Sequence, residues 1–321
     1  MNYEGLADMV EVVEPHRIDV HHHILPMEYI SSLARISINK SAGVAFPQWD
    51  IEKSLALMDR KSIMAAIVSI SAPGIYFGNR NFARELARSC NEFSARLIQE
   101  YPERFGAFAV LPLPDIEASL LELEYALDTL NLDGVGLLSS IDGQYLGNPE
   151  TDYLLSELNR RKAVVFVHPN APPDHMLPKT NIPPAIMEFV FDTTRAVANL
   201  IITRTIRRYP DIRFIFPHAG GTIPFLAGRI SMGEQKVIQY LKTLYYDIAL
   251  SATPYALRSL QELAEPSHIL FGSDFPFLPE PLITSMIEGL ENYKGFSDEM
   301  RYSIEQKNAL ALFPRFKLHL K

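Results

Sequence analysis

Eight short apolar runs recur along this chain, and each is followed by enough sequence for one helix. The runs are rich in Val, Ile and Phe and are bounded by turn-forming residues, a pattern typical of buried strands. They cover residues 17–21, 64–71, 105–111, 134–139, 163–168, 213–218, 244–250 and 269–274. This regular alternation constrains the chain more than any other feature of its sequence.

The segments between the runs repeat apolar residues every three or four positions, the period of a helix that buries one face. Leu86, Cys90, Phe93 and Leu97 form one such series. Nearly continuous apolar strands alternating with amphipathic helices indicate a parallel sheet covered by helices. Eight such units in 321 residues predict an α/β fold, a (β/α)8 TIM barrel. We expect a single domain over residues 1–321, because barrels of this length fold as one unit.

Two stretches depart from the regular alternation. Residues 169–212, after the fifth strand, open with a Pro-rich loop and continue with a helix expected over 185–207. We predict a long loop-helix insertion there, because long structured loops are usually functional. After Pro281 we expect one or two extra C-terminal helices, with Ser297 or Asp298 as an N-cap.

Composition excludes several classes of protein. The 30 Lys and Arg against 38 Asp and Glu give a net charge of −8, and such a chain lacks the positive field that attracts nucleic acid or an anionic membrane. The longest uncharged run, 62–79, is broken by Pro73-Gly74 and is therefore no membrane span. The single cysteine, Cys90, excludes an intramolecular disulfide. The acidic N-terminal residues lack the order of a signal peptide, so we expect a cytoplasmic protein.

His21 and His23 stand at the end of the first predicted strand, in the run Asp19-Val20-His21-His22-His23. Side chains alternate along a strand, so His21 and His23 point the same way and His22 points the other way. Two imidazoles placed like this can share one metal ion. An expression tag would stand at a terminus rather than behind a buried strand, which favours metal ligation.

Three more polar residues end predicted strands: His168 the fifth, His218 the sixth and Asp274 the eighth. The carboxyl ends of all barrel strands meet at one mouth, where the active sites of barrel enzymes lie. A buried His or Asp without a partner carries a desolvation cost, so we expect these side chains to share one site with the first two. Three imidazoles and one carboxylate suit a divalent transition ion with an open position; zinc is favoured and manganese is the alternative.

The remaining histidines are expected outside that site. We place His16 and His268 at the opposite rim of the barrel and His319 in the terminal tail. His175 lies in the Pro-rich loop, where contact with solvent is favoured over contact with substrate.

The sequences around the strand ends resemble those of one family. Asp-Val-His-His-His-Ile-Leu-Pro, Phe-Val-His-Pro-Asn, Phe-Pro-His-Ala-Gly-Gly and Phe-Gly-Ser-Asp-Phe-Pro are similar to the motifs of the mononuclear, decarboxylating branch of the amidohydrolase superfamily. This branch includes 2-amino-3-carboxymuconate-6-semialdehyde, γ-resorcylate and 6-methylsalicylate decarboxylases, and the resemblance spans Ile18 to Pro276. Residues 71–74 and 191–195 are most similar to the 6-methylsalicylate decarboxylases.

The resemblance implies a role for each matched residue. It makes His21, His23, His168 and Asp274 the metal ligands and gives His218 the position of the catalytic histidine. Related barrels with two metal ions carry a lysine on the fourth strand; residues 134–140 contain none, which indicates one metal ion per subunit. Relatives also suggest a homodimer or homotetramer.

The reaction implied is loss of CO₂ from a small aromatic, salicylate-like acid, with 6-methylsalicylate to m-cresol as the specific expectation. The ring carbon must gain a proton as the bond to CO₂ breaks, while a metal ion binds the carboxylate and an ortho hydroxyl as a Lewis acid. We expect Asp274 to donate that proton and His218 to polarise substrate or water, although the opposite assignment stays open.

Three further residues are candidates for contact with the substrate. Trp49 and Phe277 are expected to supply apolar walls around the ring. Arg195 is a candidate clamp for the carboxylate, because a guanidinium matches that geometry. If Arg195 reaches across a subunit contact, activity needs the oligomer.

Two other functions fit the same residues. Hydrolysis of a lactone or an amide would use the same ligands, with His218 or Asp274 as the base, and would release no CO₂. The other alternative is a binding protein with a structural metal; it is disfavoured because structural zinc sites are usually closed and rich in cysteine.

Overall fold

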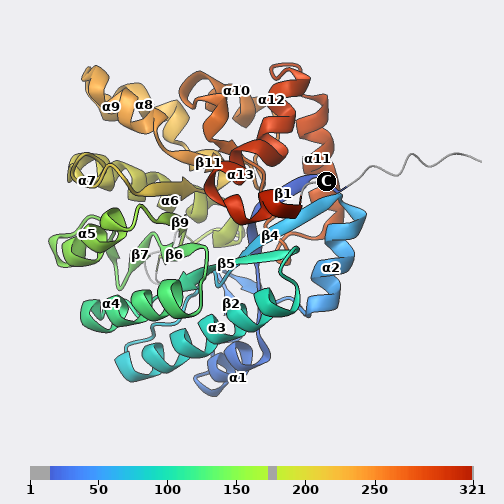
Figure 1. The fold of residues 1–321 in the computed structure, drawn as a ribbon. Coiled ribbons are helices and arrows are strands. Elements are labelled where there is room, and N and C mark those ends of the chain that lie inside the picture. Colours follow the sequence, from blue (N-terminus) through green and yellow to red (C-terminus); the bar gives the residue numbers. More distant parts are fainter. Residues whose placement is uncertain (1–14, 173–178, 320–321) are drawn as a thin grey trace, which may run out of the picture.

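Eight parallel strands form the centre of the molecule in a computed structural model, which describes residues 15–172 and 179–319 (Figure 1). Their order in the sheet follows the sequence, and every neighbouring pair is parallel. The strands are β1 (Arg17–His23), β4 (Ile63–Ser69), β5 (Phe105–Val110), β6 (Gly134–Leu138), β9 (Val164–His168), β10 (Arg213–Phe216), β11 (Tyr245–Asp247) and β12 (Ile269–Leu270). The alternation predicted from the sequence is confirmed.

The sheet closes on itself through the segment that follows β12. The backbone N–H of Val20 donates to Phe271 at 3.0 Å, that of Asp274 to His21 at 2.7 Å, and that of His23 to Phe275 at 2.6 Å. These bonds join the last segment of the sheet to the first strand, so the fold is an α/β barrel of the TIM type.

Helices cover the outside of the barrel (Figure 1). Several begin at a side chain that accepts a backbone hydrogen bond, as Asp50, Asn79 and Thr253 do. The helices are α1 (Met27–Arg35), α2 (Ile51–Arg60), α3 (Arg80–Glu100), α4 (Ile116–Glu124), α5 (Asp152–Arg160), α6 (Pro184–Ile202), α7 (Thr205–Arg208), α8 (Ile223–Ser231), α9 (Gln235–Lys242), α10 (Pro254–Leu263), α11 (Glu280–Asn292), α12 (Asp298–Tyr302) and α13 (Asn308–Leu312). No helix within the described residues is long and apolar enough to cross a membrane.

The C-terminal segment closes the end of the barrel opposite the strand carboxyl ends. Phe313 and Phe316 pack in one buried cluster with inward-facing residues of the strands, including Phe166. The buried Arg17 at the start of β1 donates to Glu305 at 2.8 Å and to Glu291 at 2.7 Å. Within the described residues, the extra C-terminal helices therefore cover one end of the barrel and leave the carboxyl ends of the strands as its mouth.

Some local features differ from the sequence expectations. Two short hairpins, β2 (Lys40–Ser41) with β3 (Val44–Ala45) and β7 (Ser140–Ile141) with β8 (Gln144–Tyr145), are too short to show a periodic pattern. The helix expected over 185–207 is two helices, α6 and α7, because Arg204 adopts a left-handed conformation with φ 58°. His175 lies outside the described residues. Ser297 caps α12, as predicted.

Candidate metal centre and active-site cavity

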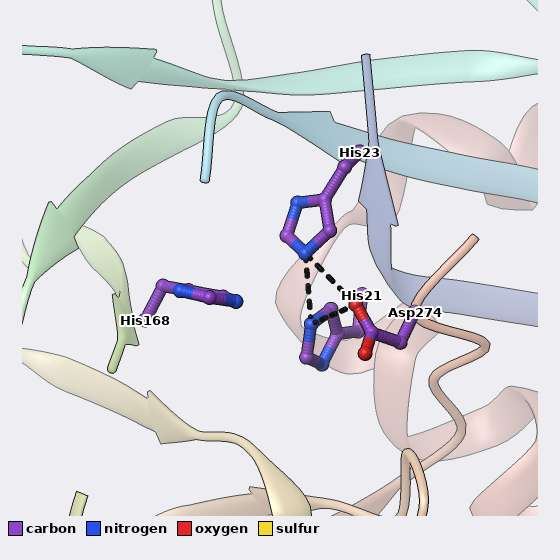
Figure 2. A group of neighbouring side chains, drawn as sticks. All are labelled: His21, His23, His168 and Asp274. Carbon is purple, nitrogen blue, oxygen red and sulfur yellow. Dashed lines mark hydrogen bonds and ion pairs between the residues drawn. The ribbon is translucent and has the colours of Figure 1, made fainter. Parts of the chain in front are cut away.

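Four side chains meet at the mouth of the barrel: His21, His23, His168 and Asp274 (Figure 2). Each offers one ligand atom, and these atoms all lie within 4.8 Å of one another. Nε2 of His21 and Nε2 of His23 are 3.0 Å apart, and Oδ1 of Asp274 lies 3.3 Å and 3.2 Å from them. Bonds of about 2.1 Å to one ion place neighbouring ligand atoms at separations like those among His21, His23 and Asp274. The four residues form a metal-binding site.

Asp274 reaches this site from a turn rather than from the end of a strand. The last strand stops at Leu270, four residues earlier, so the strand expected over 269–274 is too long. Asp274 adopts a left-handed conformation with φ 58°, and its N–H donates to the carbonyl of His21 at 2.7 Å. The turn brings the carboxylate back over the carboxyl end of β1.

The second nitrogen of each ligand histidine has a hydrogen-bond partner. Nδ1 of His21 is 2.9 Å from Asp247 Oδ2, Nδ1 of His23 is 2.9 Å from Ser69 Oγ, and Nδ1 of His168 is 2.7 Å from the carbonyl of Pro169. Such partners fix the ring orientation and the tautomer of a metal-binding histidine. They leave all three Nε2 atoms to face the site.

Burial and neighbouring charges shift the pKa values of these groups strongly. Burial lowers the pKa of His21, but the carboxylates of Asp247 and Asp274 outweigh it and raise that pKa to about 10. Burial also lowers the pKa of His23 to about 4 and holds that of His168 well below its usual range. Burial raises the pKa of Asp274, yet the neighbouring histidines, His21 first, hold it well below the usual range. The metal-free site therefore contains a carboxylate and two neutral imidazoles.

His218 lies beside the four ligands. It follows β10 by two residues and adopts φ 56°, so the strand expected over 213–218 ends early at Phe216. Its Nε2 is 3.9 Å from Asp274 Oδ2, and neither ring nitrogen has a hydrogen-bond partner within the described chain although both are buried. A buried imidazole without partners has its hydrogen-bonding capacity left for a ligand.

A cavity of about 460 Å³ opens above the metal site. His168, His218 and Asp274 form its floor, and Phe277 and residues of α6 form its sides. The lining is mostly apolar; its members are Ser41, Val44, Ser71, Ala72, His168, Ala185, Ile186, Phe189, Val190, His218, Leu250, Ser251, Asp274, Phe277, Leu278, Pro279 and Leu282. A mostly apolar pocket with a few convergent polar groups is typical of a small-molecule site.

Of the residues predicted to contact substrate, the structure brings Phe277 to the cavity. Its ring lies 5.7 Å from that of His23, edge to face. Trp49 lies elsewhere, because its indole N–H donates to Ser54 Oγ at 2.8 Å and Ser54 in turn contacts the outward-pointing His22. Arg195 is exposed on α6 beside Tyr145 and does not line the cavity of its own chain.

Two buried acids were missed in the sequence. Asp247 interrupts the apolar run Leu-Tyr-Tyr-Asp-Ile-Ala-Leu, and Asp19 interrupts Arg-Ile-Asp-Val. Both are fully buried. Asp19 accepts from Ser273 N–H at 2.9 Å and from Ser273 Oγ at 2.5 Å, which holds the segment next to Asp274. An acid inside an apolar run was a usable sequence signal, because a carboxylate in a buried strand needs partners.

A third buried acid, Asp192 on α6, holds the loop that follows His168. It accepts hydrogen bonds from Ser139 Oγ, from Tyr145 OH at 2.5 Å and from the Asn170 N–H at 2.8 Å. The N–H of Ser139 donates to the carbonyl of His168 at 2.8 Å. Asp192 thus connects the helix that walls the cavity to one of the metal ligands.

The fold and the site define a metal-dependent barrel enzyme, and comparison with known proteins identifies its family. The model of the family described as Amidohydrolase matches residues 18–315, so the chain belongs to that family. Decarboxylase yanB of Aspergillus niger is 37% identical over 94% of this chain and 88% of its own length. The 6-methylsalicylic acid decarboxylase of Penicillium expansum is 35% identical over 94% of this chain and 97% of its own. Within the family, the chain is a carboxy-lyase.

Solved structures agree with this placement. An amidohydrolase II structure is 31% identical with a TM-score of 0.88, and covers 93% of this chain and 99% of its own. The 5-carboxyvanillate decarboxylase of Novosphingobium aromaticivorans, complexed with manganese and 4-hydroxy-3-methoxy-5-nitrobenzoic acid, has a TM-score of 0.83 at 21% identity, over 93% of this chain and 96% of its own. At that identity the second structure establishes only the shared fold.

Proposed function

We propose that this enzyme removes CO₂ from 6-methylsalicylate and releases m-cresol, without an oxidant. The observation that carries the proposal is the composition of the cavity: a metal site with a free imidazole at its floor, and apolar walls elsewhere. A ring with an acid, an ortho hydroxyl and a methyl group has one polar edge and one apolar edge, which matches that division. The similarity to a 6-methylsalicylic acid decarboxylase supports the same substrate.

The donor set fits one divalent ion per subunit. Three imidazoles and a carboxylate favour zinc, and manganese, which the 5-carboxyvanillate decarboxylase contains, is the alternative. When bound, the ion supplies Lewis-acid charge that holds the carboxylate and the ortho hydroxyl of the substrate and stabilises developing negative charge. Among the described lining residues there is no Lys or Arg, so the positive charge for the substrate carboxylate would come from the bound metal and not from these residues.

We assign the proton transfer to Asp274, with His218 beside it. Asp274 Oδ1 faces the ligand histidines, whereas Oδ2 faces His218. Because its pKa lies well below the usual range, Asp274 is ionised before substrate binds and receives its proton with the substrate, from the ortho hydroxyl. It then passes that proton to the ring carbon as the carbon–CO₂ bond breaks, and the phenolate product regains a proton from water.

His218 has two tasks in this scheme. A ring N–H of His218 donates to the substrate or to Asp274 Oδ2, which keeps the transferred proton near the ring. Phe189 and Phe277 on the cavity walls place apolar surface beside the same space. Such surface favours loss of neutral CO₂ over hydrolysis, which needs a water molecule held in position for attack.

The proposal also covers the oligomeric state and the cellular location of the protein. We propose a cytoplasmic homodimer or homotetramer, in which the exposed Arg195 of one subunit reaches the substrate carboxylate of another. Large apolar side chains at the surface, among them Phe225 on α8 and Met232 after it, support a subunit contact. Light scattering of the purified protein measures the assembly directly, and a monomer with full activity would contradict a clamp across subunits.

The decisive experiment incubates zinc- or manganese-loaded protein with 6-methylsalicylate and measures CO₂ and m-cresol. His218→Asn is expected to lower kcat about 10²- to 10⁴-fold while metal content stays at the wild-type level. His268→Asn is the matched control, because His268 lies at the opposite end of the barrel, before β12. Absence of CO₂ from every ortho-hydroxybenzoate tested, with turnover of a lactone or amide instead, would replace this proposal by the hydrolase alternative.

A further inference from the structure

Four large aliphatic side chains that line the cavity are also exposed to solvent. They are Val44 on β3, Ile186 on α6, Leu250 after β11 and Leu282 on α11, exposed by 37%, 64%, 50% and 52%. We call these four residues the apolar rim. They come from four separate elements, so the mouth of the cavity is bordered by apolar surface on several sides.

The apolar surface continues from the rim to the metal site. Ile186, Phe189 and Val190 occupy positions i, i+3 and i+4 of α6, and all three line the cavity. The ring of Phe189 lies 5.5 Å from that of the ligand His168, edge to face. One face of α6 therefore forms a continuous apolar path between a metal ligand and the solvent.

The cavity is large for the proposed substrate. A cavity of about 150 Å³ is enough to hold a benzene ring, whereas this one measures about 460 Å³. The space beyond one aromatic ring and its polar groups is therefore substantial, and it extends toward the apolar rim.

The polar groups of the lining do not suit a second charge in that space. Apart from the metal site and His218, the polar side chains among the described lining residues are the hydroxyls of Ser41, Ser71 and Ser251. Hydroxyls do not neutralise a carboxylate or an ammonium group, and burying an unpaired charge is costly. The additional space thus fits an uncharged, apolar extension of the substrate.

We infer that the site accepts 2-hydroxy-6-alkylbenzoic acids whose alkyl chain is longer than methyl, with the chain lying along α6 toward the apolar rim. The products are the corresponding 3-alkylphenols and CO₂. This inference rests on the proposed function and specifies its substrate class. A chain that covers Ile186 and Leu282 removes apolar surface from water both on the protein and on the substrate.

The test is a homologous series of these acids, with methyl, propyl and pentyl substituents, given to the metal-loaded enzyme. Complete burial of a methylene strengthens binding about fourfold, and a half-exposed rim supplies about half of that burial. We expect kcat/KM to rise about twofold for each added methylene. A flat or falling series, with 6-methylsalicylate still converted, overturns this inference and leaves the proposed function standing. If no member of the series releases CO₂, the proposed function fails and the inference fails with it.

Two matched variants test where the alkyl chain of the substrate lies. Ile186 and Ile202 are both exposed isoleucines of α6, but only Ile186 lines the cavity. Ile186→Ser is expected to lower the ratio of kcat/KM for the pentyl acid to that for the methyl acid, about three- to tenfold if most of the chain contact is lost. Ile202→Ser is expected to leave this ratio unchanged. An equal ratio in both variants means that the chain does not follow α6 and overturns the assignment.

Discussion

Replacing Asp247 by asparagine is expected to weaken metal binding about 10- to 100-fold while the barrel stays folded. Asp247 is fully buried and uses its two oxygens differently. Oδ1 accepts from the backbone N–H groups of His218 at 3.1 Å and Ala249 at 2.9 Å, and Oδ2 lies 2.9 Å from Nδ1 of His21. The variant keeps the size of the side chain, so only charge and hydrogen-bond polarity change.

The tautomer of His21 carries the main effect. The two backbone donors hold the amide oxygen of Asn at the Oδ1 position, so the NH₂ group faces His21 Nδ1. His21 then accepts at Nδ1 and carries its proton on Nε2. Nε2 is the atom that faces His23 and Asp274. Metal binding needs the tautomer of His21 that carries its proton on Nδ1. In the variant this N–H would face the NH₂ group of the asparagine, so two donors would oppose each other.

The loss of the negative charge of Asp247 also affects how much metal affinity is lost. The carboxylates of Asp247 and Asp274 raise the pKa of His21 to about 10, because they stabilise positive charge on this ring. The same carboxylates stabilise a metal ion on Nε2. In the variant, weaker competition from protons therefore restores part of the affinity. The net loss of about 10- to 100-fold corresponds to roughly 1.4 to 2.7 kcal/mol.

Competition between the protein and a chromophoric chelator for zinc at pH 7 measures this loss. Asp133→Asn is the control, because Asp133 accepts a backbone hydrogen bond from Ala107 at 2.9 Å and pairs with Arg315 at the closed end of the barrel. Wild-type affinity in a folded Asp247→Asn protein would refute the tautomer argument. Equal losses in both variants would point to general destabilisation instead.

Three further predictions concern protonation and buried charges. Metal binding at pH 7 should release about one proton, because His21, with its pKa of about 10, must lose its proton to bind the ion. The apparent metal affinity should therefore rise about tenfold per pH unit up to that pKa. Calorimetry in buffers of different ionisation enthalpy measures the number of protons released. Arg17→Met takes the guanidinium away from the buried Glu305, which keeps its contact with His16 at 3.4 Å, and should lower the free energy of unfolding, measured in urea, by about 3 kcal/mol, the low end for a broken buried ion pair; a double change of Arg17 and Glu305 to apolar residues should recover much of it. Asp192→Asn places an amide donor among three donors, Tyr145 OH among them, and should cost about 1 to 3 kcal/mol by the same assay.

The barrel was predictable because its strands are buried on both faces. Such strands appear in the sequence as continuous apolar runs, and each run found there corresponds to one strand of the sheet. The hairpins β2–β3 and β7–β8 have strands of two residues, and no periodic signal exists at that length. Of the aromatic walls, Phe277 lies at the cavity while Trp49 does not, since its place depends on packing between distant segments.

The metal ligands were predictable from spacing and strand ends, but their environment was not. Alternation along β1 separates His21 and His23 from His22, whose ring contacts Asp19 and Ser54 on the other side of the strand. The carboxylate on His21 comes from Asp247, far along the chain. The closed barrel brings His21 and Asp247 together. Their wide separation in the sequence does not indicate that they form a pair.

The proposed proton-transfer pair shows why the strand-end rule finds the region of the site but not its geometry. His218 and Asp274 both lie beyond the ends of their strands and adopt φ 56° and 58°, conformations that cost about 1 to 3 kcal/mol each for residues other than glycine. The backbone N–H of each is held by the metal-site strands, His218 by Asp247 Oδ1 and Asp274 by the carbonyl of His21. The bonds that impose these two turns therefore involve His21 and the acid that orients its ring, so ligand placement and the placement of the proton-transfer pair depend on the same few contacts.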